Sequence, residues 1–164
     1  MFVKTFPVKK RSPFRLLLLL ALPIAFSCTT VDLYEKSVSI PGHAWASNFK
    51  PDFDFQIGDS LATYRVFLVL RHNDRYNFNN IYVNLYIKGP GQDTAQKVQR
   101  DLELGNNEKG WLGKGMDDVY EHRTLLAEQN FKSGTYHFTL EQIMRENPLK
   151  NVLDAGIRVE KLKP

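Results

Sequence analysis

The side chains that carry catalysis or bind metals are present in this chain, but not in the spacings that such chemistry needs. No two of the four histidines, His43, His72, His122 and His137, stand two or four residues apart, as ligands on one strand or one helix would. His137 lies in an alternating segment and is expected to face solvent. No Gly-x-Ser-x-Gly motif occurs. We expect no enzyme, no cofactor and no metal site; scattered carboxylates are the only route left to catalysis.

A glycine-rich segment at residues 110–118, Gly-Trp-Leu-Gly-Lys-Gly-Met-Asp-Asp, is the densest local signal. It resembles a phosphate-binding loop but lacks the Gly-Lys-Ser/Thr ending. One interpretation is a tight loop whose Trp111 plugs the end of the fold. The other is a partner-binding loop, with Trp111 as anchor surrounded by Lys114, Asp117 and Asp118. We favour packing, because a lone tryptophan is more often packed than exposed.

Three aspartates, Asp52, Asp54 and Asp59, could suggest a calcium site. Asp52 and Asp54 are spaced to share one face of a strand, but the glycine-bearing loop of an EF-hand is missing. A solvated acidic face is the favoured interpretation.

Cys28 has the clearest predicted chemistry. It is the only cysteine, so the chain can form no intramolecular disulfide and no cysteine-built zinc site. The segment Ala25-Phe26-Ser27-Cys28 resembles a bacterial lipobox, in which the cysteine thiol is acylated and becomes the first residue of the mature chain. Acyl chains such as palmitate would then anchor it stably in a membrane. The alternative is a leader cut by the ordinary signal peptidase, with Cys28 an incidental thiol.

The residues before Cys28 indicate export. Residues 1–15 carry five basic and no acidic side chains, and residues 16–26 form an apolar run, shorter than the roughly 20 residues that cross a bilayer. Without residues 1–27 the 22 basic residues fall to 17 against 18 acidic ones, so the net charge changes from +4 to −1. A nucleic-acid partner is therefore not expected.

The remaining chain has the two-residue periodicity of strands. It predicts an all-β, antiparallel β-sandwich, immunoglobulin-like or jelly-roll-like, with one short helix starting near residues 140–145. The expected domains are 1–27, a lipoprotein signal peptide; 28–45, a tether and first edge segment; and 46–164, the sandwich. The predicted strands are 52–57, 61–71, 81–88, 94–104, 135–140 and 156–162.

Several short motifs in a fixed order are similar to those of one known family. After Cys28 they are Ala-Trp at 44–45, Trp-Leu-Gly-Lys-Gly at 111–115, Phe-Lys-Ser-Gly-Thr-Tyr at 131–136, Met-Arg-Glu-Asn-Pro-Leu at 144–149 and Gly-Ile-Arg-Val-Glu at 156–160. Together they resemble the gliding-motility-associated lipoprotein GldH family of the Bacteroidetes. The resemblance extends over essentially the whole chain from Cys28 onward.

The resemblance implies an envelope lipoprotein required for gliding and for the linked type IX secretion apparatus, with other envelope proteins of that machinery as partners. It transfers no catalytic residue, and only Cys28, as the acylation site, carries over. Residues 28–32 lack the acidic run that resembles surface-export signals in these bacteria. We therefore expect an outer-membrane lipoprotein that faces the periplasm.

Two tripeptides, Asp-Ser-Leu at 59–61 and Asp-Thr-Ala at 93–95, resemble the Asp-Ser/Thr-apolar acceptor for O-glycosylation in Bacteroidetes. Their hydroxyls, on Ser60 and Thr94, lie in predicted turns or strand starts. Such tripeptides are also common by chance.

Two other functions stay open. One is an outer-membrane glycan-binding module, in which Tyr76, Phe78, Tyr82 and Tyr86 stack against sugars if the four rings share an exposed face. The other is a cell-wall hydrolase, which would need a cleft with convergent carboxylates or histidines.

Overall fold

The computed structural model describes residues 1–2 and 33–162. Predictions that concern Cys28 and the leader lie outside the described residues. Within residues 33–162 the chain is almost entirely β-structure, and its one helical element is a short 3-10 turn, η1 (Pro41–His43). No helix in the described part of the chain has the length and apolar character needed to cross a membrane.

The strands follow one another in chain order, and their bounds are β1 (Leu33–Ser39), β2 (Ala44–Trp45), β3 (Asp52–Ile57), β4 (Thr63–Asn73), β5 (Asn80–Lys88), β6 (Gln96–Glu103), β7 (Gly105–Asn106), β8 (Gly110–Trp111), β9 (Lys114–Met116), β10 (Val119–Asn130), β11 (Gly134–Gln142), β12 (Leu149–Lys150) and β13 (Val152–Lys161).

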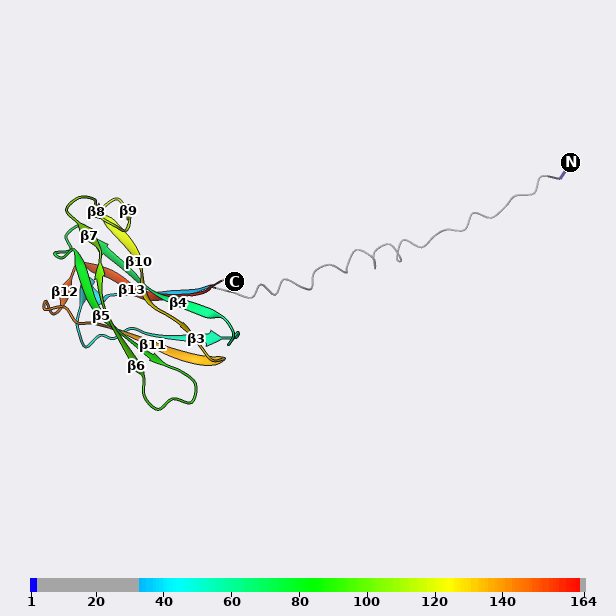
Figure 1. Cartoon of the computed structure of the whole chain (residues 1–164). Helices are drawn as coiled ribbons and strands as arrows, with labels where there is room; N and C mark the ends of the chain where they lie inside the picture. The colour runs from blue at the N-terminus through cyan, green and yellow to red at the C-terminus, as the bar shows by residue number, and fades with distance from the viewer. Residues whose placement is uncertain (3–32, 163–164) are drawn as a thin grey trace. The chain divides into compact units, whose positions relative to one another are not determined.

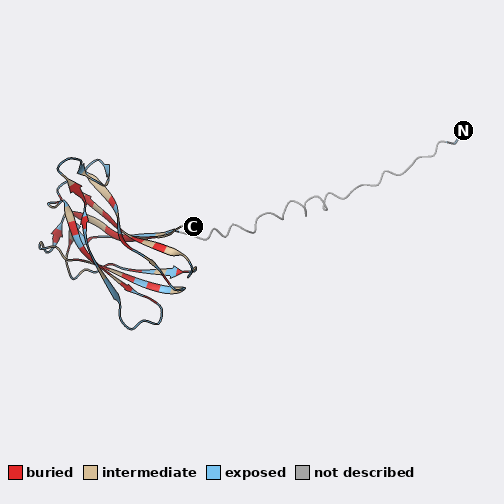
Figure 2. Ribbon diagram, in the orientation of Figure 1, coloured by how far each residue is buried: buried red, intermediate tan, exposed pale blue. Residues whose placement is uncertain are grey.

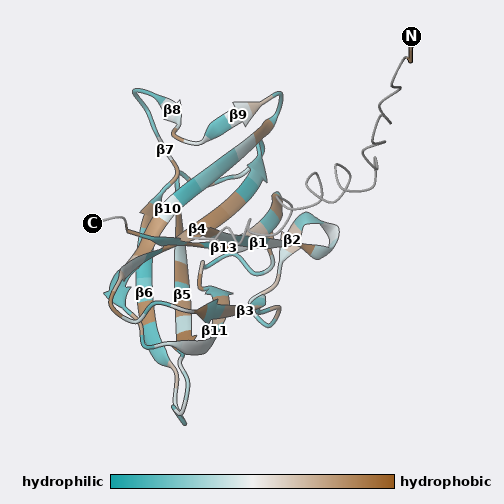
Figure 3. Cartoon of the chain, turned by 90° about the vertical axis from the view of Figure 1, so that its right-hand side faces the viewer, coloured by the Kyte–Doolittle hydropathy of each residue, from teal (hydrophilic) through white to brown (hydrophobic). Residues whose placement is uncertain are grey.

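Two sheets carry the fold. The five-stranded sheet has the order β1-β13-β4-β10-β9, and the four-stranded sheet has the order β3-β11-β5-β6. Neighbouring strands in both sheets run antiparallel. Figures 1 and 3 show β7, β8 and β9 at one end of the fold and the β5–β6 turn at the other. The predicted antiparallel all-β sandwich is confirmed.

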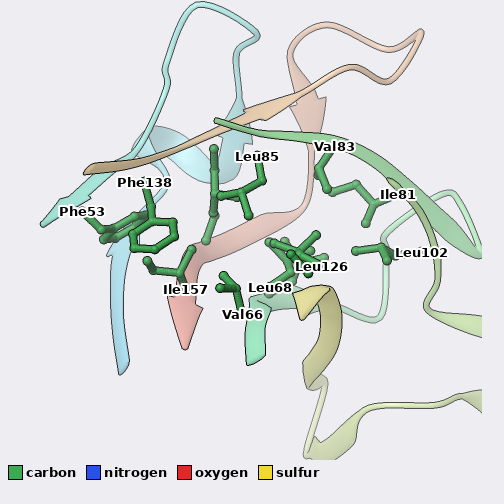
Figure 4. Close-up of a cluster of buried hydrophobic side chains, with 14 of the residues drawn as sticks. Phe53, Val66, Leu68, Ile81, Val83, Leu85, Leu102, Leu126, Phe138 and Ile157 are labelled. Atoms are coloured by element: carbon green, nitrogen blue, oxygen red, sulfur yellow. The ribbon is translucent and has the colours of Figure 1, made fainter. Parts of the chain in front are cut away.

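The core lies between the sheets because alternate residues of each strand point inward. On β4 these are Val66, Leu68 and Leu70, all fully buried, and they face apolar residues such as Val83 and Leu85 of β5. Figure 4 shows side chains from both sheets meeting in one cluster, and Figure 2 shows buried and exposed residues alternating along β11. This packing fixes which side chains remain on the outer faces.

The prediction of a short helix near residues 140–145 is wrong. β11 continues to Gln142, and residues 143–148 follow as an irregular bend. Gln142 is fully buried; its Nε2 donates to the Trp45 carbonyl at 3.0 Å and its Oε1 accepts from the Met144 N–H at 2.8 Å. These contacts hold the segment extended, so tertiary structure overrides its local helical signal.

The fold includes residues that the sequence assigned to a tether and first edge segment, 28–45. β1 is the edge strand of the five-stranded sheet and pairs with β13 along its length. Trp45 of β2 is fully buried, and its indole N–H donates to the Phe49 carbonyl at 2.8 Å. β1 and Trp45 therefore belong to the sandwich, although both lie within residues 28–45.

Candidate functional site

The fold brings together two histidines that lie 50 residues apart in sequence. His72 belongs to β4 and His122 to the neighbouring strand β10, and their Nε2 atoms are 2.9 Å apart. Both side chains are buried, with exposed fractions of 0% and 4%. A spacing rule along one strand could not find this pair, because it forms across two strands.

The hydrogen bonds of this pair define its protons. The His72 Nδ1 lies 2.7 Å from the Asn73 carbonyl, which only accepts, so this nitrogen carries a proton. In the neutral ring the His72 Nε2 then accepts, and the His122 Nε2–H donates to it. Burial, together with the charge of His72, lowers the pKa of His122 to about 4, and burial also lowers the pKa of His72. The site favours two neutral rings.

Aromatic side chains surround the histidine pair. The centroid of the His72 ring is 4.4 Å from that of Trp111, 4.9 Å from that of Tyr76 and 5.8 Å from that of Tyr120. Trp111 is half-buried and packs against the core. The Trp111 ring, which the sequence proposed as an anchor for a partner, is therefore already in contact with His72 and the core.

Gly113 shows how closely the glycine-rich loop approaches the pair. A Cβ at this position would lie 2.6 Å from the Glu121 carbonyl oxygen and 2.8 Å from the His122 Nε2. No side chain fits there without displacing β10. Glycine at 113 is thus explained by close approach, and not by phosphate binding.

The histidine pair is not arranged as a metal or catalytic centre. No group of three or more His, Cys, Asp or Glu side chains in the described residues could hold a metal ion. A histidine general base is normally oriented by a carboxylate. Here the partner of His72 Nδ1 is a backbone carbonyl. What this arrangement can do is share one proton and pack the end of the sandwich.

The other residues of the predicted partner-binding loop remain at the surface. Lys114, Asp117 and Asp118 are exposed, and so are Leu112 and Met116, with exposed fractions of 46% and 73%. A partner that binds this loop would meet these side chains first. The loop as a binding site stays a prediction.

A second polar cluster lies on the outer face of the four-stranded sheet around Glu141. The Glu141 carboxylate accepts hydrogen bonds from the Tyr86 hydroxyl at 2.7 Å and Asn84 Nδ2 at 2.9 Å, and pairs with Lys50 Nζ at 2.6 Å. These contacts, that of Lys50 first, lower the pKa of Glu141 to about 2. The carboxylate is therefore ionised at neutral pH, and its partners are the three side chains named above.

The four aromatic residues proposed to stack against sugars do not share one exposed face. Tyr76 is buried, with an exposed fraction of 4%, and its ring packs against Phe78 at 5.9 Å between centroids. Only Tyr82 and Tyr86, which alternate with the buried Val83 and Leu85 along β5, lie on the outer face. Glycan stacking by all four rings is therefore wrong.

The aspartates of the predicted acidic face have separate partners. Asp52 accepts a hydrogen bond from the Thr139 hydroxyl at 2.7 Å, Asp54 pairs with His137, and Asp59 pairs with Lys161 at 2.9 Å. They do not converge on one point. His137 is exposed, as the alternation predicted.

Sequence reasoning passed over a Ser-x-x-Lys tetrapeptide at residues 47–50. In penicillin-binding proteins such a pair supplies a nucleophile and its base. Here the Ser47 hydroxyl accepts from Asn147 Nδ2 at 2.9 Å, and Lys50 pairs with Glu141. The two side chains have different partners, so they do not form a catalytic pair.

Two of the three predicted modification sites, Ser60 and Thr94, lie within the described residues, and Cys28 does not. Ser60 and Thr94 are both exposed, Ser60 in a turn and Thr94 in a bend before β6. A glycan could be attached at either, and their glycosylation stays a prediction. Cys28 lies outside the described residues, and its lipidation stays a prediction as well.

The fold and its surface thus define an all-β sandwich domain with a buried histidine pair at one end and polar outer faces. The family model of the GldH lipoprotein matches residues 32–159, which is essentially all of this sandwich. The chain belongs to the GldH lipoprotein family.

Two curated relatives extend the match over most of the chain. The chain is 31% identical to the gliding motility lipoprotein GldH homolog of Christiangramia forsetii, over 92% of this chain and 98% of that protein. It is 29% identical to the gliding motility lipoprotein GldH of Flavobacterium johnsoniae, over 88% of this chain and 94% of that protein. The predicted family is confirmed.

Solved structures are more distant. A chain of the Cry4Aa toxin of Bacillus thuringiensis matches with a TM-score of 0.44 at 12% identity, over 79% of this chain and 21% of the toxin. A cellulose-specific carbohydrate-binding module, CBM28, matches with a TM-score of 0.41 at 12% identity, over 77% of this chain and 69% of the module. Neither likeness supports a statement about function.

Proposed function

We propose that this chain is a lipid-anchored lipoprotein of the bacterial envelope and a non-enzymatic accessory component of the gliding-motility and type IX secretion machinery. The observation that carries the proposal is the family match over residues 32–159, together with coverage of 98% and 94% of two relatives that are named gliding motility lipoproteins. A match of this extent includes nearly the whole sandwich and not an isolated motif.

The lipobox-like segment that ends at Cys28 supports the membrane part of the proposal. It precedes the first described strand, Leu33–Ser39, by only a few residues. The acylated residue would thus be joined to the sandwich by a short segment and would hold it close to the membrane. The absence of an acidic run in residues 28–32 favours the periplasmic face of the outer membrane.

The states of the titratable side chains support an accessory role over a catalytic one. The buried histidine pair contacts a backbone carbonyl and aromatic rings, and the most strongly shifted carboxylate, Glu141, is held by three partners. A histidine general base works best with a pKa near the operating pH, and burial lowers the pKa of His122 to about 4. Function then depends on surfaces and partners.

Deleting the gene in a gliding, secretion-competent host tests the proposal. Colony spreading, cell movement on glass and secretion of a type IX substrate should all be lost, and wild-type gene expressed from a plasmid should restore them. Cross-linking in native envelopes should recover other components of the machinery. Intact gliding and intact secretion in the deletion strain would refute the proposed role.

A further inference from the structure

A pocket of about 430 Å³ opens on the outer side of the four-stranded sheet, beside the exposed ring of Tyr82. It is not part of the histidine cluster or of the glycine-rich loop. Its lining combines apolar groups with hydrogen-bonding groups, as small-molecule sites do. Its lining includes Phe78, Asn80, Tyr82, Gln99, Met144 and Arg145.

Asn84, whose cross-strand partner Gln99 lines this pocket, has an unsatisfied hydrogen-bond acceptor. Its side chain is 3% exposed, and its Oδ1 has no hydrogen-bond partner among the described residues. The Nδ2 of the same amide donates to Glu141, which lies opposite Asn84 on β11. On the other side of β5, Asn84 pairs with Gln99 of β6. A buried acceptor without a donor costs about 1–3 kcal/mol.

Gln99 separates this acceptor from the pocket. It lines the pocket and is exposed on the outer face of β6. A long, exposed side chain can change rotamer at little cost, which would open a path from the pocket to the Asn84 oxygen. A ligand that reaches this oxygen must carry an O–H or N–H donor.

Arg145 contributes an unpaired positive charge. Its guanidinium lines the pocket and forms no hydrogen bond or ion pair with the residues that the structure describes. Asp101, which pairs with Tyr82 across β5 and β6, accepts a hydrogen bond from Asn80 Nδ2 at 2.7 Å and raises the pKa of the Tyr82 hydroxyl. An arginine with free donors matches a carboxylate or a phosphate on a ligand.

We propose that this pocket binds an acidic sugar residue of an envelope glycan. The Tyr82 ring offers a flat apolar platform for the C–H face of a pyranose, as aromatic rings do for planar apolar surfaces. A hydroxyl of the sugar donates to Asn84 Oδ1, and Arg145 pairs with its carboxylate or phosphate. Phe78 and Met144 close the apolar side of the pocket.

Each competing ligand class leaves part of this site unused. A purely apolar ligand would leave the Asn84 oxygen without a donor and Arg145 without an anion. A free inorganic anion would engage Arg145 but not the Tyr82 platform. A ring that is apolar on one face, rich in hydroxyls at its edge and negatively charged uses all three features, and acidic pyranoses have this character.

Two envelope polymers could supply such a sugar, and calorimetric titration of the full-length lipoprotein in detergent micelles distinguishes them. The probes are deacylated lipopolysaccharide oligosaccharide and solubilised peptidoglycan strands, both from the native host, with maltohexaose as a neutral glucan. We expect saturable binding to one of the two acidic probes and binding to maltohexaose that is at least tenfold weaker. The assay needs no gliding, so it is independent of the proposed function.

Variants assign the binding to this pocket. Tyr82→Leu keeps an apolar side chain but removes the ring, and should raise the Kd for the acidic probe at least tenfold. Arg145→Gln should raise that Kd at least fivefold and leave the maltohexaose Kd unchanged. Leu61→Ala, at a side chain that is 90% exposed and outside the pocket, is the matched control and should change neither. Circular dichroism verifies that each variant is folded.

Three results would overturn the proposal. The first is no saturable binding to any of the three probes. The second is binding that Tyr82→Leu and Arg145→Gln leave unchanged although both variants are folded, which would move the site elsewhere. The third is equal affinity for maltohexaose and for the acidic probes, which would refute the role of Arg145.

Discussion

His72 and His122 share one hydrogen bond in a site from which solvent is excluded. Each ring is neutral there because the pKa of both is lowered by burial. In the unfolded chain both return to the ordinary value of 6.5. A difference in proton binding between folded and unfolded states makes stability depend on pH.

The sign of that dependence follows from the lowered pKa values. Between pH 6.5 and pH 4 the unfolded chain binds more protons than the folded chain, so acid favours unfolding and stability rises with pH. We expect the free energy of unfolding to be constant above about pH 7 and to fall by about 1–2 kcal/mol by pH 5. Urea unfolding at pH 7.5, 6 and 5 measures it.

Two variants separate this pair from the other histidines. His122→Gln keeps a donor toward His72 but does not titrate, and should reduce the pH dependence. His137→Gln, at an exposed histidine of the other sheet, is the matched control and is measured at the same three pH values. Equal stability at pH 7.5 and pH 5 in the unmodified protein would contradict the assignment of two buried neutral rings.

At the scale of strands, the sequence correctly predicts the strands in which apolar and polar residues alternate without interruption. β3 and β5 were expected at nearly their observed bounds, because Phe53, Ile57, Val83 and Leu85 keep strict alternation. The segment Gly89-Pro90-Gly91, which follows β5 directly, marks its turn.

β10 was not expected, although it is the longest strand of the described chain at 12 residues. The register shifts between Leu125 and Ala127, so Leu125 is exposed while Leu126 and Ala127 are buried. A bulge of this kind breaks the two-residue period by one residue. Its other inward side chain, His122, is a polar residue that hydrophobic patterning does not count.

The contact between β1 and β13 yields a prediction about Gly156. A Cβ at this position would lie 2.3 Å from the Lys36 carbonyl oxygen and 2.6 Å from the Ser37 Cα, and both of these belong to the backbone of β1. Gly156→Ala must therefore push β1 away from the sheet. We expect it to lower the free energy of unfolding by about 1–3 kcal/mol, measured by urea denaturation.

Gly58→Ala is the matched control for this substitution. No heavy atom lies within 4 Å of a Cβ at Gly58. Its effect should stay within about 0.5 kcal/mol of the unmodified protein, because neither contacts nor backbone strain oppose the added methyl. If Gly156→Ala were as stable as Gly58→Ala, the tight pairing of β1 with β13 would be wrong.

At the scale of the whole molecule, the family was identifiable from sequence because its motifs recur in a fixed order, while the candidate sites were not. The histidine pair, the Glu141 cluster and the pocket beside Tyr82 each combine residues from at least two strands or connecting segments. Their members become neighbours only through strand register, which local patterns do not specify. The membrane anchor, in contrast, is a purely local signal.

The anchor yields the last prediction, which concerns Cys28→Ala. Without a thiol no acyl chain can be attached, so radiolabelled palmitate should not be incorporated and the protein should move from the membrane fraction to the soluble fraction. Loss of stable two-chain anchoring is the expected cause. Circular dichroism of the released protein should show unchanged β-structure.

Ser27→Ala is the control that isolates the thiol, because it keeps a small residue directly before the cysteine. It should label with palmitate and remain in the membrane fraction as the unmodified protein does. Membrane retention of Cys28→Ala at the unmodified level would mean that the sandwich itself binds the membrane or a membrane partner. Labelling of Cys28→Ala with palmitate would show that acylation occurs at another residue, and either result would refute Cys28 as the anchor.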